Sequence, residues 1–491
     1  MSRIIPRASV DRFDGVADVI VCGFGGAGVC AALEAGDAGS SVLLFERFSA
    51  GGGSTEMSAC EMYLGGSGGT SLQRDLGFED SSENFHNYLM ACLGDHADED
   101  KVRAYVDGAA AHFDWMELQG VPYKRAYFDG RDVVALTGDS LQYTGNERVW
   151  PYTEAATPIP RGHLPADAGH DGGKVLMGVL KKNAAAHERI DIRCDARVQA
   201  LIVDDTGAVC GAGVKIDNRV QYFFARQGVV LTAGGFIMNE RMTRQHIAAL
   251  DGFATRHGNP GDMGDGILLG VAAGGNAINM GEAFLCVAHY PPAQLTYGIF
   301  VNEQGQRFIN EDSYLARMAD AVLRQSNQRG FMFIDNRHFA RPDYQELAEI
   351  VAVGETVEEV ERDSGLPEGS LQHTVEVYNQ HAAKGEDPLF HKAANWLQPF
   401  DTPPYALVDY SLPTLRPATF TLGGLDTLPT GEVLTADREV VPGLFAAGRT
   451  AAGIPRTSAG YASGMSVGDA TFTGRRAGQR VAALPRRADP S

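Results

Sequence analysis

The chain has 491 residues, more than one hydrophobic core usually spans, so we expect two domains. Its 44% hydrophobic and 21% charged residues are ordinary for a globular protein. The formal net charge of −20 argues against nucleic acid or an anionic membrane as a partner, although an acidic surface that keeps the protein soluble explains it equally well.

Cysteine usage and the lack of long apolar runs indicate the compartment. Seven cysteines are scattered without a Cys-x-x-Cys pair, which is typical of a reduced enzyme. The first residues lack the apolar core of a signal peptide, and no uncharged apolar run approaches the ~18 residues of a membrane span. The sequence therefore predicts a cytoplasmic protein without a membrane span.

The first predicted unit is a strand, a tight glycine turn and a helix. Residues 19–22 form a short apolar run typical of a buried strand, and residues 27–38 are expected to form the helix. Gly23 permits the tight turn, Gly25 lets the backbone approach a pyrophosphate, and Gly28 lets the helix pack closely on the strand. The pattern predicts a dinucleotide whose phosphates face the helix N-terminus, with contacts from Gly23, Gly25, Gly26, Ala27 and Gly28.

A second predicted strand, residues 42–45, ends in an acid. Glu46 follows Gly28 by eighteen residues. At the carboxyl end of its strand, this carboxylate is placed to accept hydrogen bonds from an adenosine ribose. We therefore expect Glu46 to bind a cofactor that has no 2′-phosphate.

Residues 49–55 form a second glycine-rich turn. Its backbone N–H groups are able to lie against a ligand, so we expect cofactor contacts from Gly52, Gly53 and Ser54. A solvent-exposed loop is the alternative.

The middle of the chain is expected to return to the same sheet. A helix is predicted at residues 174–183, and residues 190–230 contain short β-rich runs separated by turns. They lead to a further apolar strand that ends in paired glycines. We expect this strand to join the first sheet and to bring Ala233, Gly234 and Gly235 to the same cofactor.

Two later glycine-rich segments complete the predicted cofactor site. The loop at residues 261–267 carries Asp262 and Asp265, which we expect to orient a turn or the cofactor, with Asp265 as a contact. Near the C-terminus, residues 442–448 end in Gly448, also an expected contact. No metal site is expected, because the thirteen histidines show no metal-binding spacing.

These glycine motifs, in this order, resemble the FAD-binding superfamily of fumarate reductases and 3-ketosteroid dehydrogenases over essentially the whole chain. The resemblance implies an α/β fold with a discontinuous Rossmann-like FAD domain, residues 1–281 and 426–491. A substrate-capping α+β domain, residues 282–425, would interrupt it, with the active site between the two over the flavin. The segment after the second glycine turn lacks the histidine of covalently flavinylated members, so noncovalent FAD is expected.

The residues that fumarate-reducing members use to bind a dianion are largely missing. Thr419 stands in place of the histidine of their His-x-Thr-x-Gly-Gly segment, and Leu315 stands where their catalytic arginine is expected. Arg456 fits their substrate-binding arginine, although an ion pair explains it equally well. Arg449 stands where many members carry an acid, which leaves its role open. These departures argue against a dicarboxylate substrate.

Hydroxyl side chains replace the charged set, namely Tyr314 in the predicted cap and Tyr461 and Ser463 near the C-terminus. Neutral donors suit a neutral ketone, because they stabilise the enolate that forms as its α-proton leaves. The triplet is similar to that of the 3-ketosteroid Δ4-(5α)-dehydrogenases. This similarity implies that Ser463 takes the 4β proton, while Tyr461 and Tyr314 relay protons to solvent and bind the carbonyl, in an order that spacing leaves open.

Each of these hydroxyls also has a structural interpretation. A neutral serine is a poor base, so the role of Ser463 depends on an adjoining tyrosine with an unperturbed pKa of about 10. Alternatively, Ser463 is the N-cap of the helix that follows, and Tyr314 is an ordinary core residue of the cap.

The resemblance therefore implies an oxidoreductase that introduces a C4–C5 double bond into 5α-3-ketosteroids and passes the C5 hydride to FAD. Its partners would be a small neutral steroid and an external electron acceptor. A 3-ketosteroid Δ1-dehydrogenase and a fumarate-reductase-like enone or alkene reductase are the alternatives. A noncatalytic electron carrier is the least favoured, because it needs neither the cap nor the hydroxyl set.

Overall fold

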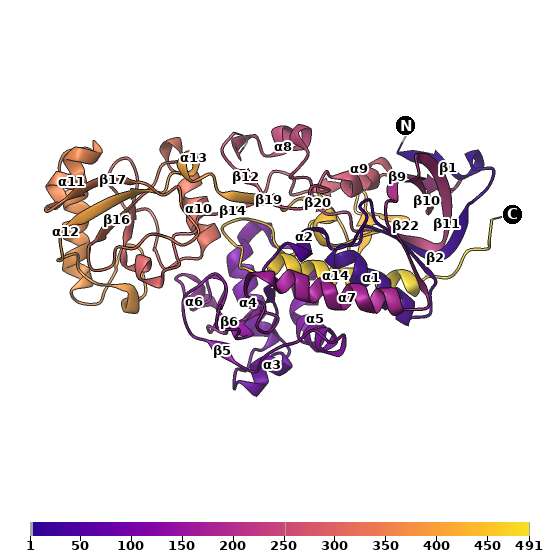
Figure 1. Cartoon of the computed structure of the whole chain (residues 1–491), viewed down its shortest axis with the longest axis horizontal. Coiled ribbons are helices and arrows are strands. Elements are labelled where there is room, and N and C mark those ends of the chain that lie inside the picture. Colours follow the sequence, from indigo (N-terminus) through magenta and orange to yellow (C-terminus); the bar gives the residue numbers. More distant parts are fainter. Residues whose placement is uncertain (1–2, 251, 491) are drawn as a thin grey trace.

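The computed structural model describes residues 3–250 and 252–490, and within these ranges nine strands form the main sheet (Figure 1). Its path runs β1-β9-β10-β11-β2-β3-β8, while β22 pairs with both β11 and β21. The strands are β1 Ile4–Pro6, β2 Gly15–Cys22, β3 Val42–Phe45, β8 Ile190–Arg193, β9 Arg197–Val203, β10 Val209–Ile216, β11 Arg219–Leu231, β21 Glu432–Leu434 and β22 Val440–Ala446. The predicted α/β fold class is confirmed.

Four parallel strands end at one edge of the main sheet. Cys22 of β2 pairs in register with Phe45 of β3 and with Leu231 of β11. Leu231 in turn pairs with Ala446 of β22. These ends are apolar and buried, as expected of parallel strands covered on both faces. The residues that follow the four strands therefore meet, although they come from distant parts of the chain.

Three helices lie side by side against this sheet (Figure 1). They are α1 Gly26–Asp37, α7 Gly172–Ala186 and α14 Met465–Ala482, the first two at the positions that the sequence predicts. A Cβ on Gly474 of α14 would lie 2.2 Å from the carbonyl oxygen of Ala27 on α1. Only glycine permits this approach, which holds the C-terminal helix and the loop before it beside the first glycine turn.

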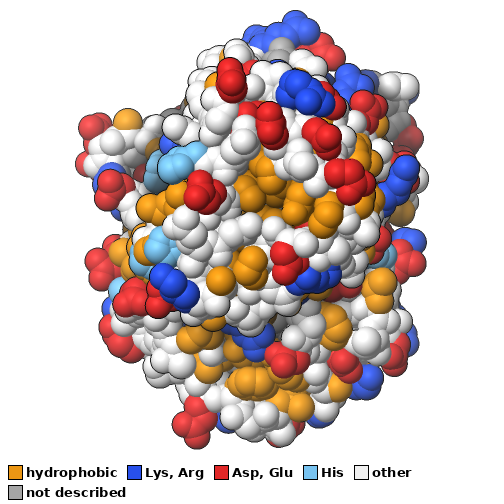
Figure 2. Space-filling model, turned by 90° about the vertical axis from the view of Figure 1, so that its left-hand side faces the viewer, with side chains coloured by type: hydrophobic (Ala, Val, Ile, Leu, Met, Phe, Trp, Pro, Cys, Tyr) orange, Lys and Arg blue, Asp and Glu red, His pale blue; other side chains and the backbone are white. Residues whose placement is uncertain are grey.

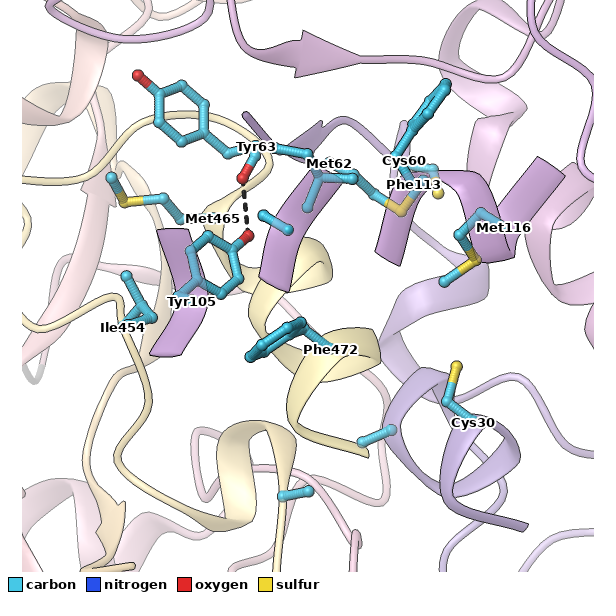
Figure 3. Packing of buried hydrophobic residues seen from close by; sticks show 14 of the residues in the cluster. Cys30, Cys60, Met62, Tyr63, Tyr105, Phe113, Met116, Ile454, Met465 and Phe472 are labelled. Atoms are coloured by element: carbon cyan, nitrogen blue, oxygen red, sulfur yellow. Dashed lines mark hydrogen bonds between the residues drawn. The ribbon is translucent and has the colours of Figure 1, made fainter. Parts of the chain in front are cut away.

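A mainly helical layer packs below α14 and carries a small sheet. Its helices are α3 Ser71–Asp75, α4 Ser82–Leu93, α5 Glu99–Leu118 and α6 Tyr152–Ala155, and its strands are β4 Met62–Tyr63, β5 Tyr127–Phe128, β6 Leu141–Gln142 and β7 Gly162–His163. The short helix α2 Gly53–Glu56 packs against α7 instead. Figure 3 shows how Tyr105 points at β4, where its hydroxyl donates a hydrogen bond to the carbonyl oxygen of Tyr63 at 2.7 Å. The Tyr105 ring also packs edge-on against Phe472 of α14, with centroids 5.1 Å apart. These contacts fix the backbone of β4 against the C-terminal helix.

The distal part of the molecule, on the left of Figure 1, is built on an antiparallel sheet of order β15-β16-β18-β17 in the described chain. Its elements are β15 Ile299–Val301, α10 Leu315–Leu323, β16 Phe331–Asp335, β17 Ile350–Gly354, α11 Val357–Ser364, α12 Ser370–Ala382, β18 Tyr405–Asp409 and α13 Leu412–Leu415. The paired strands β14 Ala283–Cys286 and β19 Ala418–Thr421 lead the chain into this part and back. The predicted domain boundaries stay a prediction.

Short elements connect the two parts. They are α8 Glu240–His246, β12 Thr255–Arg256, α9 Asp265–Ala272, β13 Ala277–Ile278 and β20 Gly424–Leu425. Single 3₁₀ turns occur at Arg7–Ser9, Gly94–His96, Gly169–Asp171, Ala248–Leu250, Ala293–Tyr297, Ser326–Gln328, Ala394–Trp396 and Gly448–Thr450.

The surface at the distal end mixes apolar and charged side chains (Figure 2). Exposed apolar side chains of the described residues include Ile350, Val351 and Val353 of the outer strand β17. None of the helices in the described ranges combines the length and the apolar character that a membrane span requires.

Candidate active site

A cavity of about 400 Å³ runs along the edge where the parallel strands end. Its walls come from the turns after β2, β3, β11 and β22, from the loop before α14, and from strands β14 and β19. The three predicted catalytic residues line it, and so do the predicted cofactor residues except Gly28, Gly52 and Gly235. The structure therefore brings the two predicted sets together, while the role of each residue stays a prediction.

The first glycine turn forms one end of the cavity. Gly23 has φ 117°, and a Cβ there would lie 2.5 Å from the carbonyl oxygen of Thr232. Gly25 is the N-cap of α1 and, together with Gly26 and Ala27, lines the cavity. The N-terminus of α1 therefore faces the cavity with its backbone N–H groups, an arrangement that suits a phosphate.

Three glycines that we expected to contact the cofactor lie behind the lining. A Cβ on Gly28 would lie 1.8 Å from the carbonyl oxygen of Gly23, so Gly28 serves close packing between turn and helix. Gly52 precedes α2 as its N-cap, and Gly235 lies against the hydroxyl of Thr421. These three glycines therefore lie behind the residues that line the cavity.

Glu46 is held at the cavity wall by two backbone groups. Its Oε2 accepts a hydrogen bond from the N–H of Phe24, and its Oε1 accepts one from the N–H of Phe48, both at 2.9 Å. The side chain is mostly buried and lines the cavity. Each carboxylate oxygen keeps acceptor capacity for a ribose hydroxyl.

The second glycine-rich turn borders the cavity through Gly53 and Ser54, so it is not a loop that lies only in solvent. The hydroxyl of Ser54 donates to Asp262 Oδ2 at 2.8 Å and accepts the N–H of Asn259 at 2.9 Å. Arg449 donates to the same Asp262 oxygen at 2.6 Å. Asp262 thus orients the second glycine-rich turn. Arg449, whose role the sequence leaves open, forms an ion pair with Asp262 at the cavity wall.

Asp265 lines the cavity but is already paired. It accepts hydrogen bonds from Arg197 at 2.8 Å and from Arg47 at 3.3 Å, and both arginines also line the cavity. Its carboxylate therefore positions two cations at the end of the cavity near Glu46.

Aromatic rings form the opposite end of the cavity. Phe284 of β14 stacks on Phe420 of β19, with centroids 4.6 Å apart and planes 15° apart. Tyr461 packs against both, at 4.6 Å and 5.9 Å, and the ring of Tyr314 lies 6.5 Å from that of Tyr461. Such walls suit an apolar ring system with few polar groups.

The two tyrosines are buried proton donors. Burial raises the pKa of Tyr461 to about 12 and the pKa of Tyr314 well above its ordinary value. The expectation of a tyrosine with an unperturbed pKa is therefore wrong, because both hydroxyls have lost most of their contact with water. They are better hydrogen-bond donors than proton acceptors at neutral pH.

Ser463 is fixed through its backbone. Its N–H donates to the carbonyl oxygen of Thr144 at 2.9 Å, and the hydroxyl of Thr144 donates to the carbonyl oxygen of Ser463 at 2.8 Å. The N-cap of α14 is Gly464, so the alternative interpretation of Ser463 as a helix cap is wrong. Ser463 itself lines the cavity.

Sequence reasoning missed Glu61, which lines the same cavity. Its side chain is buried, and its Oε1 has no hydrogen-bond partner within the described chain. Burial raises the pKa of Glu61 to about 7, while the neighbouring Ser463 side chain lowers it. No motif in the sequence marks this residue, because its position depends on the distant loop before α14.

The residues that would bind a dicarboxylate are engaged elsewhere. Arg456 forms an ion pair with Asp98 at 3.4 Å and lies outside the cavity lining, which favours the ion-pair interpretation. The hydroxyl of Thr419 donates to the carbonyl oxygen of Phe284 at 2.6 Å, and Leu315 is buried in the core.

Metal-binding groups and disulfides were sought among the described residues. No group of three or more His, Cys, Asp or Glu side chains in residues 3–250 and 252–490 is arranged to hold a metal ion. All seven cysteines, which the structure describes, are free thiols.

Comparison with known proteins identifies relatives along nearly the whole chain. The family described as "FAD binding domain" matches residues 18–464. The crystal structure of 3-ketosteroid-Δ4-(5α)-dehydrogenase from Rhodococcus jostii RHA1, in complex with 4-androstene-3,17-dione, is 39% identical. That similarity covers 98% of this chain and 100% of that chain, with a TM-score of 0.92.

Curated proteins of two activities also resemble this chain. Urocanate reductase from Eggerthella lenta is 28% identical over 95% of this chain and 75% of its own length. The 3-oxo-5-alpha-steroid 4-dehydrogenase from Comamonas testosteroni is 25% identical over 89% of this chain and 93% of its own length.

Proposed function

Because the chain belongs to the FAD-binding family that its residues 18–464 match, we propose that it is an FAD-dependent dehydrogenase introducing a C4–C5 double bond into 5α-3-ketosteroids. The observation that carries this proposal is the position of three hydroxyl residues at the aromatic end of the cofactor cavity. They are Tyr314, Tyr461 and Ser463.

The cofactor is FAD, and the cavity fits it. The N-terminus of α1 would offer backbone N–H groups to the pyrophosphate, beside that of Gly26, which donates to Thr55 Oγ1 at 3.3 Å. A Cβ on Gly25 would lie 3.9 Å from Gly53 Cα in the second glycine turn. Glu46 would hold the adenosine ribose. We propose noncovalent binding. When bound, FAD supplies the acceptor for the hydride that leaves C5 of the steroid.

The aromatic end would bind the steroid. Phe284, Phe420 and Tyr461 offer flat apolar surfaces, which suit fused rings. A dicarboxylate would find Arg456 engaged with Asp98 outside the cavity lining. The relative from Rhodococcus jostii, whose structure contains 4-androstene-3,17-dione, supports a steroid of this class.

We assign the carbonyl-binding role to Tyr461. Its hydroxyl accepts a hydrogen bond from the N–H of Ser466 at 3.2 Å, so its own proton is free for the C3 oxygen of the substrate. With a pKa of about 12, Tyr461 stays protonated at neutral pH. Its hydrogen bond would stabilise the charge that develops on this oxygen, by roughly 3 to 4 kcal/mol in comparable sites. Tyr314, whose ring lies 6.5 Å from that of Tyr461, is a second donor.

Ser463 would remove the proton from C4. Its backbone is held at both N–H and carbonyl by Thr144, which fixes the position from which the side chain projects. Loss of this proton makes the carbon electron-rich, so that the hydrogen on the adjacent C5 leaves with its electron pair. The enone then forms with C4 and C5 joined by a double bond.

The remaining expectations are part of the same proposal. We propose that residues 1–281 and 426–491 form the FAD domain and residues 282–425 the cap, supported by the two strands that lead into and out of the distal part. An external acceptor would reoxidise the flavin. A cytoplasmic location is supported by the seven free thiols.

Product analysis tests this function. The purified holoenzyme is given 5α-androstane-3,17-dione and an artificial electron acceptor, and the product is identified by mass spectrometry and its enone absorbance. The Δ4 enone is the expected product. A 1,2-unsaturated product would indicate a Δ1-dehydrogenase instead, and turnover only with a reduced dye and an alkene would indicate a reductase.

A further inference from the structure

Glu61 lies directly behind the loop that carries the proposed proton acceptor. It precedes β4, and the backbone of that strand is tied to the loop before α14, because the N–H of Tyr63 donates to the carbonyl oxygen of Gly464 at 3.1 Å. A Cβ on Gly464 would lie 2.8 Å from the carbonyl carbon of Glu61 and 3.0 Å from its Cβ. Glycine at 464 therefore lets Glu61 and Ser463 come into contact range.

The carboxyl of Glu61 faces the cavity without a charged partner. It is 6% exposed and lines the cavity together with Ser463, and its Oε1 is buried with no hydrogen-bond partner among the described residues. Ionising such a group is unfavourable, because the charged carboxylate loses its contact with water and gains no charged partner. Among the interactions that shift its pKa, the effect of Ser463 is the one made by another side chain.

The titratable groups whose pKa is raised by the charge of Glu61 are all neutral at neutral pH. They come from three other parts of the chain and from its own segment, namely Tyr314, Tyr344, Tyr461 and Cys60. Burial raises the pKa of every one of them above its ordinary value. Among Glu61 and these four groups, Glu61 is the one whose pKa lies near neutral pH.

We propose that Glu61 accepts the proton that Ser463 releases when the serine hydroxyl removes the 4β hydrogen of the steroid. The C4–H bond and the Ser463 O–H bond break, and a new O–H bond forms on each of the two residues. The electron pair of C4–H becomes the C4–C5 double bond, while the C5 hydride leaves to FAD. In this role Glu61 acts through Ser463 rather than on the substrate directly.

This role removes the weakness of serine as a base. The hydroxyl never carries a full negative charge, because its proton moves to a carboxylate as the new proton arrives. It also assigns a function to a buried carboxyl that has no charged partner. The proposal rests on the proposed function and specifies where its proton goes.

The proposal has a definite pH dependence. Glu61 accepts a proton only when ionised, so flavin reduction by the steroid should rise with pH and reach half its maximum at about pH 7. His257 also lines the cavity, and burial together with the charge of Arg449 lowers its pKa. A variant of Glu61 is therefore needed to assign the titration.

Glu61→Gln and Glu61→Asp are compared with wild-type holoenzyme by anaerobic stopped-flow, with 5α-androstane-3,17-dione as substrate. In Glu61→Gln, the rate of flavin reduction above pH 7 should fall by about 100-fold or more, and this rate should no longer depend on pH. Glu61→Asp keeps a carboxylate and should recover part of the rate together with a pH-dependent profile. Bound FAD, measured by absorbance, shows that each variant is folded.

Glu282→Gln is the matched control. Glu282 is a half-buried carboxyl whose pKa is also raised by burial, but it lies outside the cavity lining. Its variant should keep the wild-type rate and profile. Infrared spectra taken below and above pH 7 provide a second readout, since a titrating carboxyl band present in wild type should be absent from Glu61→Gln.

The outcomes separate the two proposals. If wild type is reduced by the steroid and Glu61→Gln matches its rate or keeps its pH profile, the role of Glu61 is wrong while the proposed function stands. If the steroid does not reduce wild type at all, the proposed function fails and the role of Glu61 fails with it.

Discussion

Thr144 and Ser463 exchange two hydrogen bonds across the active-site wall. The N–H of Ser463 donates to the carbonyl oxygen of Thr144 at 2.9 Å, and the Thr144 hydroxyl donates to the carbonyl oxygen of Ser463 at 2.8 Å. A residue far away in the sequence thus fixes the backbone of the proposed proton acceptor. Ser463 is oriented by the fold rather than by its own loop.

Replacing Thr144 by Val tests this positioning. The variant loses one of the two hydrogen bonds, so we expect slower flavin reduction by the steroid and a loss of about 1 to 3 kcal/mol in the free energy of unfolding. Thr374→Val is the control, because its hydroxyl likewise donates to a backbone carbonyl, that of Gly305, but in the distal part. The control should lose stability without losing rate, and equal rates in all three proteins would contradict the positioning role.

Ser463→Ala removes the proposed proton acceptor. Flavin reduction should slow by about 100-fold or more, the usual contribution of a general base, while FAD remains bound because the expected cofactor contacts lie elsewhere in the cavity. Stopped-flow absorbance measures the rate, and the protein-to-flavin absorbance ratio measures occupancy. A rate equal to wild type would leave Ser463 with a purely structural role.

Tyr461→Phe removes the proposed carbonyl donor. A loss of roughly 3 to 4 kcal/mol in transition-state stabilisation, or about two to three orders of magnitude in rate, is expected. Tyr405→Phe, in the distal sheet, should retain the wild-type rate.

The pKa of Tyr461 gives this donor a second signature. Burial raises the pKa to about 12, so its donated proton is present throughout the neutral range and is lost only as the pH rises through about 12. The wild-type rate should therefore show no decrease on the alkaline side near the ordinary tyrosine pKa of about 10. A decrease there that disappears in Tyr461→Phe would contradict the buried, protonated tyrosine.

Gly28→Ala tests the packing of the first turn. A Cβ would lie 1.8 Å from the carbonyl oxygen of Gly23, so we expect the turn to shift and the purified protein to lose FAD. Gly178→Ala is the matched control, because Gly178 lies in α7 with no heavy atom within 4 Å of its added Cβ. The control should keep FAD and gain up to about 1 kcal/mol from helix propensity. Full flavin occupancy in Gly28→Ala would show that the turn tolerates a side chain.

The cofactor end of the site could be predicted from the sequence because its signals are local. A strand, a tight turn and a helix N-terminus are neighbours in the chain, so Gly23, Gly25 and Glu46 are recognised from spacing alone. The same reasoning does not separate a glycine at the cavity surface from one behind it. For this reason it did not predict that Gly28 and Gly235 lie behind the lining, where their missing side chains permit close packing.

The substrate end depends on contacts between distant segments. The high pKa of Tyr461 follows from burial, which spacing does not report. Glu61 escaped notice for a similar reason, since its neighbour Ser463 is about four hundred residues away in the chain. The alternative interpretation of Ser463 as the N-cap of α14 fails by one residue, since the N-cap is Gly464, with φ 94°.

Anaerobic titration of the oxidised holoenzyme with 5α-androstane-3,17-dione tests the central claim most directly. The account predicts that the visible flavin absorbance bleaches as the steroid is added and that 4-androstene-3,17-dione appears in equal amount. Flavin that stays oxidised with this steroid, but bleaches with a Δ4-3-ketosteroid or with succinate, would contradict it.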